Sequence, residues 1–162
     1  MAQELTAGLR APAFSLARDG GGSVSLSDFG GRPVVLFFYP NADTPGCTRE
    51  AQAFSALREA FDQAGAGIIG VSADPIEAQD KFKRKYDLSI PLASDPTHEM
   101  LTEYGVWVEK SMYGRKYMGI ERATFLVGPD SGLVRIWRKV KVEGHAEEVL
   151  AAVRALAIKK AT

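Results

Sequence analysis

The chain contains one cysteine, Cys47, and a cysteine thiolate readily combines nucleophilic and redox chemistry. The continuous apolar run at 33–40 predicts a buried strand just before Cys47. Thr44-Pro45-Gly46 predicts that a helix starts there. The first turn of a helix has unpaired backbone N–H groups and the positive end of the helix dipole, and both favour a thiolate. A lone cysteine is more often an inert core residue, so it is the position of Cys47, just after a strand, that indicates a reactive group.

Two neighbours of Cys47 have both a structural and a chemical interpretation. Thr44 is expected to cap the helix, and its hydroxyl also lies where it can hydrogen-bond an incoming substrate; the two roles do not exclude each other. Pro40 ends the strand because it lacks the N–H that a ladder needs, and it is also placed to shield the sulfur from water. Spacing alone leaves both interpretations open for each residue.

Apolar periodicity and turn residues predict an alternation of strands and helices around this segment. Strands are expected near 14–16, 24–26, 33–40, 68–72, 91–93, 123–127 and 133–137, and helices near 45–63, 74–86, 96–104 and 145–158. The stretch 105–121 indicates a strand and a loop, and residues 159–162 are expected to fray. This order predicts a single α/β domain over residues 1–162, with a mixed central sheet flanked by helices and a β-hairpin at the N-terminus.

Composition excludes several classes of partner. Lys+Arg and Asp+Glu both total 20 in 162 residues, so no general attraction to nucleic acid or to a membrane surface is expected. The N-terminus lacks the basic and apolar segments of a secretory signal, and one cysteine suits a reducing compartment, so we expect a cytoplasmic protein.

His98 and His145 are isolated, which argues against a metal site. Gly65–Gly70 has a helix before it and a strand after it, unlike a dinucleotide-binding loop.

Residues 38–51, Phe-Tyr-Pro-Asn-Ala-Asp-Thr-Pro-Gly-Cys-Thr-Arg-Glu-Ala, resemble the active-site segment of the peroxiredoxins. The family pattern of Pro, three residues, Thr, two residues and Cys falls on Pro40, Thr44 and Cys47. Similarity to the peroxiredoxin Q branch, also called bacterioferritin comigratory proteins, continues in order along nearly the whole chain.

The resemblance implies a thioredoxin-like fold and an antioxidant peroxidase that reduces hydrogen peroxide and organic hydroperoxides, with Cys47 passing through a sulfenic acid. It implies no cofactor and no metal. It also implies that Arg122 lies beside the sulfur, where a guanidinium stabilises the thiolate and orients the peroxide, and that Glu50 holds this arginine in place. From the residues alone, Arg122 would be taken as a surface charge beside a strand. For Glu50, the alternative that it is a solvated helix residue stays open.

The chain departs from the family in having no second, resolving cysteine. The two positions where this branch often carries one hold Gln52 and, near the second, Lys83. The sulfenic acid must therefore meet an external thiol: a thioredoxin, a glutaredoxin, a low-molecular-weight thiol or Cys47 of another copy. A peroxide sensor and a thioredoxin-fold chaperone remain alternatives, whereas a thiol–disulfide oxidoreductase is disfavoured because no Cys-x-x-C pair exists. The same resemblance favours a monomer and leaves a dimer open.

Overall fold

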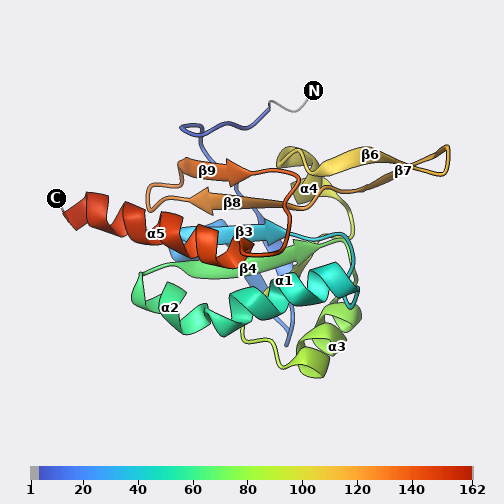
Figure 1. Ribbon diagram of the computed structural model, residues 1–162, viewed down its shortest axis with the longest axis horizontal. Coiled ribbons are helices and arrows are strands. Elements are labelled where there is room, and N and C mark those ends of the chain that lie inside the picture. Colours follow the sequence, from blue (N-terminus) through green and yellow to red (C-terminus); the bar gives the residue numbers. More distant parts are fainter. Residues whose placement is uncertain (1–3, 162) are drawn as a thin grey trace.

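The strand that leads to Cys47, β3 (Val34–Phe38), is an interior strand of the central sheet (Figure 1). The computed structural model describes residues 4–161, of which 158–161 by their backbone. Within these residues the sheet also contains β1 (Ser15–Arg18), β2 (Ser23–Ser25), β4 (Gly67–Ser72), β5 (Leu92–Ser94), β8 (Ala123–Val127) and β9 (Leu133–Trp137). The strand order is β2-β1-β5-β4-β3-β8-β9. β3 runs parallel to β4 and antiparallel to β8, so the sheet is mixed, as expected.

Different helices cover the two faces of this sheet. One face packs against α1 (Pro45–Ala56), α2 (Arg58–Gln63), α3 (Ile76–Tyr86) and α5 (His145–Ala161). The other face packs against the N-terminal segment, the 3₁₀ helix η1 (Leu26–Phe29) and α4 (Glu99–Glu103). Successive residues of β3 enter the two cores alternately, which explains why its apolar run is continuous.

The helix expected over 45–63 is wrong in one respect, because the structure divides it at Leu57 into α1 and α2. The cause lies outside the segment. Ser89, in the loop before β5, donates its hydroxyl to the carbonyl of Ser55 at 3.2 Å, and its amide donates to the Ser55 hydroxyl at 2.6 Å. A side chain that bonds a helix carbonyl interrupts the helical ladder, and no pattern within 45–63 indicates such a contact.

The expectation of a strand and a loop over 105–121 is also wrong. The structure has β6 (Trp107–Met112) and β7 (Arg115–Ile120) there, paired as a separate hairpin that projects from the central sheet (Figure 1). The two turn residues, Tyr113 and Gly114, have φ angles of 53° and 79°. Two left-handed residues are typical of the two-residue turns that favour hairpins, but a tyrosine rarely adopts this conformation, so the turn was not evident from its residues.

The other expected elements are present, with ends that differ by a few residues. They include the N-terminal hairpin of β1 and β2, the hairpin of β8 and β9, and the final helix. Residues 159–161, which were expected to fray, continue α5, and Thr162 lies outside the described residues. No helix in the described part of the chain has both the length and the hydropathy needed to cross a membrane.

Candidate active site

Cys47 is the third residue of α1 and lies where the carboxyl end of β3 meets the start of that helix. Its side chain is 1% exposed and packs in the core between the sheet and α1. The sulfur is nevertheless not surrounded by apolar groups alone, because Arg122 Nη2 donates a hydrogen bond to Sγ at 3.3 Å. A guanidinium and the positive end of a helix therefore both lie at the sulfur, which suits a thiolate.

Arg122 reaches the sulfur because of the pairing between β3 and β8. In that register Ala123 lies opposite Phe38, so the residue before Ala123 stands at the end of the sheet where β3 stops. The guanidinium bridges two groups of α1, with Nη2 on Cys47 and Nη1 donating to Glu50 Oε1 at 2.7 Å. Burial lowers the pKa of Arg122, but the charges of Glu50 and Cys47 outweigh this effect and raise the pKa overall. The guanidinium therefore keeps its charge.

Glu50 lies one turn after Cys47 on the same side of α1, and its side chain is 1% exposed. Oε1 accepts the hydrogen bond from Arg122, whereas Oε2 is buried without a hydrogen-bond partner among residues 4–157. Burial raises the pKa of Glu50 to about 7, although the guanidinium of Arg122 opposes this shift. The carboxyl group therefore exchanges its proton near neutral pH, with the guanidinium lying between it and the sulfur.

Thr44 and Pro40 belong to the loop between β3 and α1. Thr44 is the N-cap by its backbone, since its carbonyl accepts the N–H of Thr48 at 2.8 Å. The expected side-chain cap is wrong, because Thr44 Oγ1 accepts no N–H of the helix; the hydroxyl donates to the carbonyl of Asn41 at 2.8 Å. With its proton engaged there, the hydroxyl offers lone pairs and can accept a hydrogen bond from the O–H of a substrate. Pro40 is half-buried just beyond the end of β3.

Residues that the sequence did not single out hold this loop. Asp43 has a φ of 63°, and its carboxylate accepts hydrogen bonds from Lys85 Nζ at 2.8 Å and from the Tyr86 hydroxyl. Asp74 Oδ2 accepts the amide N–H of Ala42 at 2.8 Å. The end of α3 and the segment after β4 therefore fix the loop that precedes the cysteine. An aspartate tolerates the left-handed conformation better than most residues, but its partners lie 42 and 43 residues away and no local signal indicates them.

The two positions of a resolving cysteine have different surroundings. Gln52 is exposed on α1. Lys83 Nζ donates to Asp19 Oδ2 at 2.7 Å, and Asp19, which is 6% exposed, also accepts the amide N–H of Leu92 at 2.8 Å. Lys83 therefore links α3 to the turn between β1 and β2. Its side chain forms an ion pair and has no redox role.

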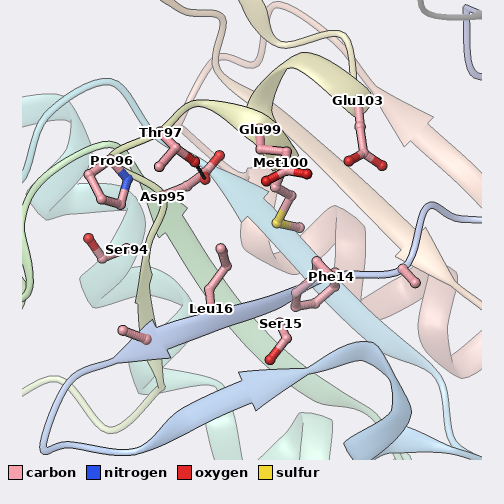
Figure 2. A pocket seen from close by; sticks show the side chains of 12 residues that line it. Phe14, Ser15, Leu16, Ser94, Asp95, Pro96, Thr97, Glu99, Met100 and Glu103 are labelled. Carbon is pink, nitrogen blue, oxygen red and sulfur yellow. Dashed lines mark hydrogen bonds between the residues drawn. The ribbon is translucent and has the colours of Figure 1, made fainter.

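A hollow of about 440 Å³ lies between β1 and α4 (Figure 2). Phe14 and Met100 line it, and both belong to the core on the face of the sheet opposite Cys47. Its buried carboxylate, Asp95, accepts the N–H of Leu101 at 2.9 Å and so is engaged in holding α4. None of the residues that line this hollow is a cysteine or a histidine. The candidate active site is therefore the one built around Cys47.

Comparison with known proteins identifies the family. The model of the AhpC/TSA family matches residues 7–136. The chain is 46% identical over 140 residues to Peroxiredoxin Bcp of Xanthomonas campestris, across 86% of this chain and 88% of that protein. It is 46% identical over 143 residues to Peroxiredoxin Bcp of Bacillus subtilis, across 88% of this chain and 91% of that protein.

Solved structures give the same result. The Bacterioferritin Comigratory Protein of Xanthomonas campestris, described for its alkyl peroxide reduction activity, matches with a TM-score of 0.88 at 44% identity, over 94% of this chain and 99% of that one. These matches confirm the expected thioredoxin-like fold and the expected family. The chain therefore belongs to the AhpC/TSA family, as a one-cysteine peroxiredoxin of the Bcp or peroxiredoxin Q branch.

Proposed function

We propose that Cys47 is the residue at which this enzyme reduces hydrogen peroxide and organic hydroperoxides, by way of a cysteine sulfenic acid. By its family the chain is a peroxiredoxin, a thiol-dependent peroxidase. The observation that carries the assignment is the 3.3 Å contact between Cys47 Sγ and Arg122 Nη2 at the start of α1. The chain holds no other cysteine that could take this role.

In the first step the thiolate of Cys47 attacks the terminal oxygen of a hydroperoxide, HO–OR. The S–O bond forms as the O–O bond breaks, so sulfur loses two electrons and the peroxide gains them; Cys47–SOH remains, and RO⁻ takes a proton and leaves as ROH. The N–H groups of Arg122 stabilise the charge on the departing oxygen, as a preorganised anion site does. Thr44 Oγ1, whose own proton is donated to Asn41, accepts the O–H of the attacked oxygen.

Glu50 and Pro40 support this step without reacting. The 2.7 Å bond from Arg122 Nη1 to Glu50 Oε1 limits the orientations of the guanidinium, so that Nη2 stays on the sulfur. Pro40 shapes the pocket and keeps water from the thiolate. Both roles are positioning roles, and neither residue exchanges a bond with the substrate.

Return to the thiol requires a reductant from outside the chain, because the sequence contains a single cysteine. One thiol, RSH, converts Cys47–SOH into Cys47–S–SR and water, and a second thiol releases Cys47–SH and a disulfide. The reductant is a thioredoxin, a glutaredoxin or a low-molecular-weight thiol. The enzyme acts in the cytoplasm, where such thiols are kept reduced. It acts as a monomer, and size-exclusion chromatography at micromolar concentration tests this.

Steady-state peroxide consumption separates an enzyme from a sensor or a chaperone. The chain is mixed with hydrogen peroxide or cumene hydroperoxide and with thioredoxin, with glutaredoxin and glutathione, or with glutathione alone. We expect many turnovers with at least one reductant and none with Cys47→Ser. Oxidation of Cys47 by one equivalent of peroxide without turnover in any mixture would favour the sensor, and no oxidation at all would exclude Cys47 as the reacting group.

A further inference from the structure

A groove of about 750 Å³ adjoins the active site between α1 and the start of α5. Gly46, Arg49 and Ala53 of α1 form one wall, and residues 141–144 with Glu147 form the other. Its volume lies within the range of sites that bind small molecules. Its concave form is unlike the extended surface of about 800 Å² that each partner of a stable protein–protein complex buries.

The lining of the groove includes a residue that contacts the reactive sulfur. Arg122 belongs to its lining, and the same guanidinium donates to Cys47 Sγ at 3.3 Å. Gly46, the residue before Cys47, also lines it and allows this approach, since a Cβ at that position would lie 3.2 Å from Arg122 Nη2. A molecule held in the groove can therefore contact the guanidinium that lies beside the sulfur.

The groove carries charges of both signs that have no partner among the described side chains. Arg49 and Lys141 are exposed cations, and Glu143 and Glu147 are exposed anions. Across the described residues, none of these four side chains forms an ion pair or a hydrogen bond. Unpaired cations and anions that face one cavity suit a ligand with both carboxylate and ammonium groups, such as the two ends of a short peptide.

We propose that this groove binds a small peptidic thiol, with carboxylates on Arg49 and Lys141 and an ammonium on Glu143 and Glu147, and so serves as the reductant site. This inference rests on the proposed function, because the bound thiol reacts with Cys47–SOH. The new S–S bond forms as the S–O bond breaks and water leaves; a second thiol then attacks the mixed disulfide and returns Cys47 to the thiol. Three extended residues span about 10 Å, which suits a cavity of this size.

The test separates the peroxide step from the thiol step. One equivalent of hydrogen peroxide first converts Cys47 to the sulfenic acid, which is quantified by mass spectrometry after trapping. The sulfenic acid is then reduced with glutathione, which has two carboxylates and an ammonium, or with 2-mercaptoethanol, which has neither. We expect the glutathione rate to saturate, and the ratio of the glutathione rate to the 2-mercaptoethanol rate to fall about tenfold in the double variant Arg49→Gln, Lys141→Gln.

Arg154→Gln, which removes an exposed cation of α5 outside the groove, is the matched control and should keep the ratio. Binding of S-methylglutathione to the reduced protein, measured by calorimetry, gives a second readout and should weaken in the double variant alone. An unchanged ratio with unchanged S-methylglutathione binding overturns the groove assignment while the peroxide step stands. Failure to form the sulfenic acid at all overturns the proposed function, and the reductant site with it.

Discussion

Replacing Glu50 by Gln should change how the stability of the protein depends on pH. Burial raises the pKa of this carboxyl group from 4.5 to about 7 in the folded chain, against the opposing charge of Arg122. Between these two values the folded chain keeps a proton that the unfolded chain has released, so the free energy of unfolding falls as pH rises. Complete passage through this window removes about 3 kcal/mol of stability.

Urea unfolding at a series of pH values from about 4.5 to 8 measures this effect. Both proteins carry Cys47→Ser, so that the thiol does not titrate, and one also carries Glu50→Gln. The free energy of unfolding of the protein that keeps Glu50, minus that of the Glu50→Gln variant, should fall by about 3 kcal/mol across the series. Glu59→Gln, which changes an exposed carboxylate on α2, should leave the difference flat.

The opposite sign would refute this reasoning. If the difference instead rises with pH, the 2.7 Å ion pair with Arg122 holds Glu50 ionised more strongly than burial opposes it. A flat difference would mean that the two effects cancel. Either result would require a different account of how Glu50 supports the guanidinium near neutral pH.

Three other substitutions test separate contacts. Cys47→Ser should abolish peroxide consumption while circular dichroism and the melting temperature stay close to wild type, because a serine side chain fits the buried position of Cys47, which is 1% exposed. Residual turnover would exclude Cys47 as the reacting group. Arg122→Lys should slow oxidation of Cys47 about 10²–10³-fold in stopped-flow measurements, because the N–H at 3.3 Å from Sγ is lost, and an unaltered rate would show that any cation suffices. Lys83→Ala should lower the free energy of unfolding in urea by about 1–3 kcal/mol, because buried Asp19 loses the nearer of its two charged partners; no loss would mean that Arg18, at 3.5 Å, and the Leu92 amide are enough.

Local pattern predicted most of the elements, and long-range contacts account for the exceptions. The continuous apolar run of β3 indicates burial on both faces whatever its neighbours are, and the Pro45-Gly46 start of α1 follows from helix-start chemistry. The break at Leu57 depends on Ser89, which lies 34 residues beyond Ser55 in the chain. The side-chain cap of Thr44 failed for a different reason, since the hydroxyl bonds the carbonyl of Asn41, on the other side of Thr44 from the helix, and accepts no N–H of α1.

The sequence by itself determined that one cysteine follows a buried strand at the start of a helix, and that no second cysteine can resolve it. It did not determine which arginine lies at the sulfur, except through resemblance to a family. Arg122 is 75 residues from Cys47, and only the antiparallel pairing of β8 with β3 brings them together. The raised pKa of Glu50 also depends on the tertiary structure, because desolvation is set by what the folded chain places around the carboxyl group and not by its neighbours in sequence.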